Sequence, residues 1–173
     1  MITGGDAMNI MLDMTVTADD ESDYITQSPK KILLVDDDPA IRQILCRLLT
    51  EEGYLVETAA NGVEALETID ASVDLVLLDL NMPVKDGWET FEALSFKYPW
   101  LPIILITARP NQFFPALASG VGALLEKPLD FVKLFDTVRT LLEEPAETRR
   151  ARMIGQPSVF QYVQPGLTSR RGC

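Results

Sequence analysis

The sequence predicts an α/β protein with a doubly wound, five-stranded parallel sheet and helices on both faces. Five short apolar runs alternate with segments of helical spacing, which is typical of consecutive βαβ units. The central run, residues 75–78, is apolar at every position, as expected of a strand buried on both faces. Right-handed crossovers then place helices on both sides of a flavodoxin-like sheet of order 2-1-3-4-5.

The first unit starts with a strand over residues 31–35, KILLV. Asp38 and Pro39 mark a helix start, because Asp is a favoured cap and Pro a favoured first helical residue. Gly53 ends that helix. Five apolar side chains recur at helical spacing and predict its buried face: Ile41, Ile44, Leu45, Leu48 and Leu49.

The middle of the chain repeats this pattern. A second strand is expected over residues 54–58, and a turn at 61–62 leads into a short helix over 63–69. The central strand follows and ends at Asp79. A third helix is expected over residues 88–98.

The last two strand–helix units follow the same pattern. A fourth strand, residues 102–106, is followed by Thr107, and a short or kinked helix containing Pro115 follows at 111–119. A fifth strand at 123–125 leads into Glu126, Lys127 and Pro128. Asp130 then caps a final amphipathic helix, whose inward side chains are expected to be Phe131, Leu134, Phe135, Val138, Leu141 and Leu142.

Three regions are expected. Residues 1–29 hold six acids and no Lys or Arg, which predicts a disordered acidic arm. Residues 30–144 form the globular domain. Residues 145–173 hold five Arg and read as loop or disorder, although 147–152 could extend a helix. A tail of this length is too short for a DNA-binding output domain, so a stand-alone domain is expected.

Composition excludes several classes of function. The formal net charge of −11 argues against nonspecific nucleic-acid binding. The chain has no His, which excludes Ser-His-Asp and Cys-His catalysis, His-liganded zinc and a phosphohistidine carrier. Cys46 and Cys173 form no CxxC pair, which fits a reducing cytoplasm. No signal peptide is evident, and no stretch is apolar enough to span a membrane.

Polar side chains stand where four of the expected strands end. Asp36 and Asp37 follow the first strand, and Asp79 ends the third. Thr107 ends the fourth, and Lys127 follows the fifth. The first and third strands are neighbours in the predicted order, so the three carboxylates should converge at one edge of the sheet.

Converging carboxylates repel one another and require a cation. Oxygen ligands with no nearby Cys or His predict Mg²⁺. A carboxylate beside Mg²⁺ can attack a phosphoryl group and form an aspartyl phosphate on Asp79. Lys127 would neutralise the phosphoryl oxygens, and the hydroxyl of Thr107 would bind one of them. Each residue alone has an ordinary structural explanation; Asp38, for instance, is expected to cap a helix rather than bind metal.

The motifs KILLVDDDPAIR (31–42), LVLLDLNMPVKDG (75–87), ILITA (104–108) and LEKP (125–128) resemble the receiver domain of two-component response regulators. This resemblance implies that Asp79 is the phosphoacceptor. It also implies Mg²⁺ ligands, namely Asp36, Asp37, Asp79 and the backbone carbonyl of Asn81. Thr107 and Lys127 correspond to the signalling threonine and the phosphate-binding lysine.

The resemblance further implies a place in a phosphorelay. The phosphoryl donor would be a phosphohistidine on a sensor histidine kinase or a phosphotransfer protein. The domain would catalyse only its own phosphorylation and dephosphorylation, and so would not be an enzyme acting on other substrates. The output protein is not named by the sequence, and a homodimer stays open. No nucleic-acid or membrane partner is expected.

One position departs from the family pattern, and two others bear on its chemistry. Family members usually carry Tyr or Phe three residues before the lysine, where this chain has Leu124. Asn81 and Arg109 occupy positions from which side chains can tune dephosphorylation. A long side chain at Arg109 is expected to shield the acyl phosphate from water.

Two other functions fit parts of the same pattern. A haloacid-dehalogenase-like phosphohydrolase also uses a strand-end Asp with Mg²⁺, and Asp36 and Asp38 have the spacing of its acidic pair. The residues after Asp38 do not continue that motif, and no cap segment is evident. A constitutive interaction module that never turns over phosphate is the second rival; Leu124 favours it, and the complete acidic set argues against it.

Overall fold

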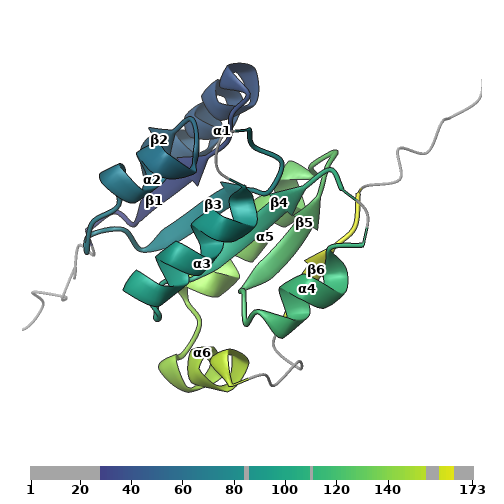
Figure 1. The fold of residues 1–173 in the computed structure, drawn as a ribbon. Helices are drawn as coiled ribbons and strands as arrows, with labels where there is room; N and C mark the ends of the chain where they lie inside the picture. Colours follow the sequence, from purple (N-terminus) through teal and green to yellow (C-terminus); the bar gives the residue numbers. More distant parts are fainter. Residues whose placement is uncertain (1–27, 84–85, 110, 155–159, 166–173) are drawn as a thin grey trace, which may run out of the picture.

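The computed structural model describes residues 28–83, 86–109, 111–154 and 160–165. The acidic arm expected at 1–29 therefore lies outside the described residues, apart from its last two positions. Within these ranges the chain folds as an open α/β sheet with a helix after each of the first five strands (Figure 1).

The parallel sheet has six strands rather than the five expected from the sequence. Its spatial order is β2-β1-β3-β4-β5-β6, so the predicted order 2-1-3-4-5 is confirmed for the first five. Every neighbouring pair runs parallel. The strands are β1 (Lys31–Val35), β2 (Leu55–Ala59), β3 (Leu75–Asp79), β4 (Ile103–Thr107), β5 (Ala123–Glu126) and β6 (Gln161–Val163).

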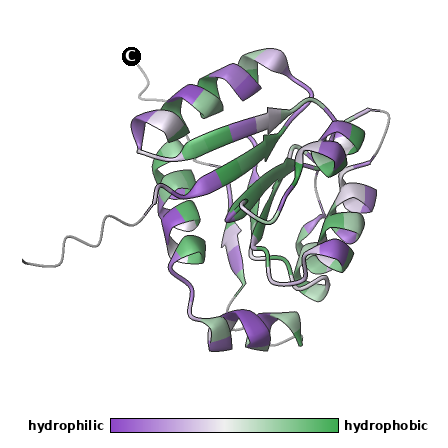
Figure 2. Cartoon of the chain, turned by 90° about the vertical axis from the view of Figure 1, so that its left-hand side faces the viewer, coloured by the Kyte–Doolittle hydropathy of each residue, from purple (hydrophilic) through white to green (hydrophobic). Residues whose placement is uncertain are grey.

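Helices cover both faces of the sheet, as predicted. Helices α1 (Pro39–Glu51) and α5 (Phe131–Leu142) pack on one face. Helices α2 (Gly62–Thr68), α3 (Gly87–Lys97) and α4 (Phe113–Ala118) pack on the other. Because side chains alternate along a strand, each strand contributes to both apolar cores. Figure 2 shows the central strands as largely hydrophobic, with mixed colours on the helices.

Local sequence determines where most helices begin. Side-chain oxygens of Asp38, Asn61, Asp86 and Asp130 accept hydrogen bonds from backbone amides in the first turns of α1, α2, α3 and α5. These bonds satisfy donors that have no partner within the helix. Helix α4 has no side-chain cap and contains Pro115, which is consistent with its length of six residues.

The C-terminal segment requires a correction, because residues 145–173 were expected to be loop or disorder. Helix α6 (Ala146–Met153) forms there, and so does β6. Arg152 is 5% exposed and makes a 2.7 Å ion pair with the equally buried Glu144. Arg149 donates to the carbonyl of Trp100, which holds α6 beside the amino end of β4. The sequence pattern allowed a helix over residues 147–152 but did not predict β6, because β6 depends on pairing with β5, which is distant in the chain.

A search for membrane-spanning helices within the described ranges found none of sufficient length and hydrophobicity.

Candidate functional site

The polar residues expected to meet do meet at the carboxyl edge of the sheet. The register pairs Val35 with Leu78, so Asp36 and Asp79 end neighbouring strands β1 and β3. Thr107 ends β4, and Lys127 directly follows β5. Parallel strands all end at the same edge, which explains why residues so far apart in sequence lie together.

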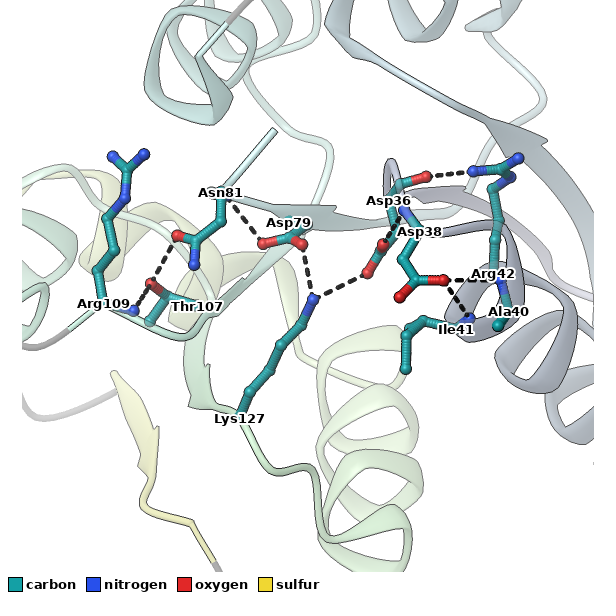
Figure 3. Close-up of polar contacts among 10 residues, drawn as sticks. All are labelled: Asp36, Asp38, Ala40, Ile41, Arg42, Asp79, Asn81, Thr107, Arg109 and Lys127. Carbon is teal, nitrogen blue, oxygen red and sulfur yellow. Dashed lines mark hydrogen bonds and ion pairs between the residues drawn. The ribbon is translucent and has the colours of Figure 1, made fainter. Parts of the chain in front are cut away.

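Lys127 bridges two buried carboxylates (Figure 3). Its Nζ lies 2.6 Å from Oδ2 of Asp79 and 3.1 Å from Oδ2 of Asp36. The two acid side chains are 3% and 1% exposed, while the lysine side chain is 23% exposed. Charge-assisted bonds of this kind are stronger than neutral ones, and here they hold Asp79 in a fixed orientation.

The same corner offers a metal site. Carboxylate oxygens of Asp36, Asp37 and Asp79 all lie within 4.8 Å of one another. Three carboxylates beside one ammonium leave an excess of two negative charges, which a divalent cation would neutralise. The donors are all hard oxygens, and Mg²⁺ prefers such ligands. The residues therefore fit the predicted Mg²⁺ site. The backbone amide of Asn81 donates to Oδ1 of Asp79 at 2.9 Å, and the ligand role of its carbonyl stays a prediction.

Burial and neighbouring charges shift the pKa values of Asp36 and Lys127. Burial raises the pKa of Asp36, and the charge of Asp79 adds to that rise. The backbone amide of Asp38 and the ammonium of Lys127 oppose it only in part. Burial alone would lower the pKa of Lys127, but its contacts with Asp79 and Asp36 outweigh this effect and raise the pKa. Lys127 therefore remains charged in the folded protein at neutral pH.

The raised pKa of Asp36 predicts that the metal-free protein loses folding stability as the pH rises. The folded state holds this proton to a higher pH than the unfolded chain, whose carboxyl has the ordinary pKa of 3.8. Stability from this group is thus present below pH 3.8 and lost as the pH rises through the folded pKa. Each unit of pKa elevation corresponds to about 1.4 kcal/mol.

An Asp36→Asn variant should therefore gain stability relative to wild type as the pH rises from 3.8 toward neutrality. Urea unfolding in EDTA across that range measures the difference in unfolding free energy. A difference that stays constant with pH would contradict the raised pKa.

Thr107 is fully buried, and two hydrogen bonds hold its hydroxyl at the end of β4. The oxygen accepts a hydrogen bond from the backbone amide of Arg109 at 3.0 Å and donates a long one, 3.4 Å, to Oδ1 of Asn81. The weak bond to Asn81 is easily exchanged for a better acceptor. Figure 3 places Thr107 and Lys127 on either side of the Asp79 carboxylate.

Two contributors to the site were not recognised from the sequence. Arg42 donates to the backbone carbonyl of Asp36 at 2.6 Å and holds the start of the acidic loop against α1. Gly87 is the last residue of the motif over residues 75–87, where the sequence pattern assigns it no role in the site. A Cβ atom there would collide with Cα of Leu80 and lie 2.6 Å from the carbonyl oxygen of Asp79. Neither requirement is visible without the fold, because each depends on how closely a helix packs against the end of the strand before it.

A Gly87→Ala variant should therefore be destabilised by about 1–3 kcal/mol, the usual cost of overpacking. Since the collision is with the backbone around Asp79, phosphoryl acceptance should fall as well. Chemical denaturation and labelling of the same preparation measure both effects. Wild-type values for both would show that α3 can shift freely.

Comparisons with known proteins agree with this geometry. The sequence profile described as the response regulator receiver domain matches residues 32–139. The chain is 37% identical over 125 residues to the transcriptional regulatory protein GlrR of Escherichia coli, covering 70% of this chain and 28% of that protein. It is 40% identical over 114 residues to the E. coli regulator CpxR, covering 65% and 49% of the respective chains. The chain thus spans about half or less of these relatives.

Solved structures of receiver proteins match over nearly their full length. A CheY-like receiver domain protein from Methanospirillum hungatei superimposes with a TM-score of 0.64 at 32% identity, covering 68% of this chain and 96% of that one. The response regulator TrrA from Thermotoga maritima, solved in complex with Mg²⁺ and BeF, gives 0.60 at 37% identity, covering 65% and 98%. The residues that match the family profile, 32–139, include every predicted site residue from Asp36 to Lys127.

Proposed function

The chain belongs to the response regulator receiver domain family, and from that premise we propose that it accepts a phosphoryl group on Asp79 in a two-component phosphorelay. The observation that carries this proposal is the meeting of Asp36, Asp37, Asp79 and Lys127 at one strand edge. The hydroxyl of Thr107 adds a donor for a phosphoryl oxygen.

The chain's own residues account for most of the chemistry. A carboxylate oxygen of Asp79 attacks the phosphorus atom, the bond from phosphorus to the donor breaks, and its electrons leave with the donor. Asn81 N and Lys127 Nζ fix the carboxylate before attack. Lys127 then neutralises charge on the phosphoryl oxygens, which is the main requirement of such a transfer. A bound Mg²⁺ would supply further positive charge, held by the three carboxylates.

The proposed donor is a phosphohistidine on a sensor histidine kinase or a phosphotransfer protein. An apolar surface beside the site suits the docking of such a donor: Ile44 is 49% exposed and Phe131 41% exposed, and both line a pocket that Lys127 shares. A phosphohistidine must reach Asp79, so its carrier must contact this side of the molecule. The proposed location is the cytoplasm, in keeping with the free thiol of Cys46.

We also propose that the protein acts only on itself, by self-phosphorylation and slow dephosphorylation. The phosphohydrolase alternative would need the carboxylate of Asp38 as an acid beside Asp36. That carboxylate instead accepts hydrogen bonds from the amides of Ala40 and Ile41 as the cap of α1. The family match gives no support to that alternative.

Incubation with acetyl phosphate tests the proposal. Covalent phosphoryl incorporation should depend on Mg²⁺ and disappear with EDTA, and beryllofluoride should block it. Incorporation without Mg²⁺, or no incorporation at all, would contradict the proposed function. Sustained hydrolysis of unrelated phosphate esters would instead favour the phosphohydrolase.

Arg109 should set the lifetime of the phosphorylated state. The residue follows Thr107 by two positions, and its backbone is fixed by the hydroxyl of that threonine. A long side chain here limits the approach of water to the acyl phosphate. An Arg109→Ala variant should lose its phosphoryl group roughly three to ten times faster, a change of about 1 kcal/mol in the barrier. Decay of purified phosphoprotein measures this, and an unchanged half-life would remove the shielding role.

A further inference from the structure

The strand β6 occupies an edge of the sheet that would otherwise be exposed. It pairs with β5 in parallel register, placing Gln161, Tyr162 and Val163 beside Ala123, Leu124 and Leu125. Figure 1 shows this yellow strand beside β5 and close to α4. An open edge offers unpaired backbone groups to any extended segment, so β6 already fills a strand-binding position.

The side chains of β6 also cover the apolar surface around α4. Phe160 and Tyr162 pack against the same core as Leu124. Phe113 of α4 contacts both rings, with centroid distances of 5.8 Å to Phe160 and 5.0 Å to Tyr162. Edge-to-face pairs of this kind add to the energy of simple burial. The segment from Phe160 to Val163 therefore covers both the β5 edge and the α4 aromatic surface.

A hydrogen bond links this segment to the phosphorylation site. The hydroxyl of Tyr162 donates to Oε1 of Glu126 at 2.6 Å. Glu126 ends β5, is the ladder partner of Thr107, and directly precedes Lys127. The amide of Lys127 donates to the carbonyl of Thr107 at 2.7 Å, so these two strand ends move together. Glu126 thus connects Tyr162 of β6 directly to Lys127 and Thr107, two residues of the phosphorylation site.

We propose that residues 160–163 form an internal cover for the β5 edge and the α4 surface, which phosphorylation of Asp79 loosens through the Glu126–Tyr162 contact. This inference rests on the proposed function. Once uncovered, the surface would bind an extended partner segment with alternating aromatic side chains, because residues 160–163, which now occupy it, have that pattern.

The direction of the effect follows from the geometry. A phosphoryl group on Asp79 attracts the hydroxyl of Thr107 and the ammonium of Lys127 toward its oxygens. Their ladder contacts draw the end of β5, and Glu126 with it, toward the site. Tyr162 is held by Phe113 and does not follow, so its bond to Glu126 lengthens. A three-residue edge strand has few other bonds, and the loss of one shifts it toward the open state.

Hydrogen–deuterium exchange of the full chain tests this, with and without Mg²⁺ and beryllofluoride. Beryllofluoride should slow exchange around Asp79 and speed exchange at residues 160–163 by roughly threefold or more, a shift of about 0.65 kcal/mol by the relation between rate and free energy. A Tyr162→Phe variant should exchange faster at these residues without ligand, and respond less to it. Tyr98→Phe is the matched control, since its hydroxyl donates to the carbonyl of Ile69 away from β6.

The outcomes separate the two proposals. Slowed exchange at Asp79 with unchanged or slower exchange at 160–163 would overturn the inference and leave the proposed function standing. No response at Asp79 would remove both. Equal effects of Tyr162→Phe and Tyr98→Phe on residues 160–163 would also overturn the inference, because the contact with Glu126 would then have no specific role.

Discussion

Replacement of Asp79 by Asn is expected to reduce phosphoryl incorporation from acetyl phosphate to background. The amide keeps the shape of the carboxylate and can still accept from the amide of Asn81, whose bond to Oδ1 is 2.9 Å. It lacks the charge and the nucleophilic oxygen that attack requires. The remaining carboxylates at Asp36 and Asp37 follow a different strand end, and that of Asp36 accepts hydrogen bonds from the amide of Asp38 and from Lys127.

Incorporation is measured on matched samples of wild type and variant in saturating Mg²⁺, with folding checked by circular dichroism. Asp136→Asn is the control, because the exposed carboxylate of that residue lies 3.8 Å from Arg139 on α5. The control should incorporate as wild type does. Undiminished incorporation in folded Asp79→Asn would show that another residue is the acceptor.

Replacement of Lys127 by Met should separate the structural and chemical roles of the lysine. Two carboxylates that are 1% and 3% exposed would lose their shared cation. Removing one member of a buried pair leaves uncompensated charge and should cost about 3 kcal/mol in EDTA at neutral pH. Added Mg²⁺ should recover most of this loss, because it binds the folded carboxylates and stabilises by mass action.

Phosphoryl acceptance should not recover in the same way. With Mg²⁺ saturating, the rate of incorporation should remain about 100-fold below wild type, since a fixed charge on the phosphoryl oxygens is missing. Stability is measured by urea unfolding and incorporation by timed labelling. Lys133→Met, at an exposed residue 4.0 Å from Asp130, is the control. Loss of stability that Mg²⁺ leaves unchanged would contradict the shared-cation role, and a wild-type rate would contradict the chemical one.

Local sequence predicts much of this fold for identifiable reasons. Strands such as LVLLD are apolar at consecutive positions, and caps such as Asp38 and Asp130 form bonds within three residues of themselves. Expected and observed bounds differ by one or two residues at most element ends. The site residues were predictable because each ends a strand, and parallel strands bring their ends to one edge.

The C-terminal elements were predictable only in part, as a possible helix over residues 147–152. Arg152 lies in a polar stretch and reads as exposed, yet it is buried because Glu144 and the carbonyl of Gly120 satisfy its guanidinium. Residues 161–163 are too short a run to predict a strand from the sequence. They form one because β5 offers an open edge with which they can pair. The partly buried ring of Tyr162 packs against Phe113, which is far away in the chain.

By itself, then, the sequence determined the order of the first five strands, the acidic corner around Asp79 and the family to which the chain belongs, since these follow from short-range patterning and strand ends. Only the tertiary structure decided that Lys127 bridges Asp36 and Asp79, that Gly87 must lack a side chain, and that the C-terminal segment covers the sheet edge. The lysine bridge and the covered sheet edge depend on distances between residues remote in sequence, and the glycine depends on how closely α3 packs against the end of β3; chain folding alone sets these distances.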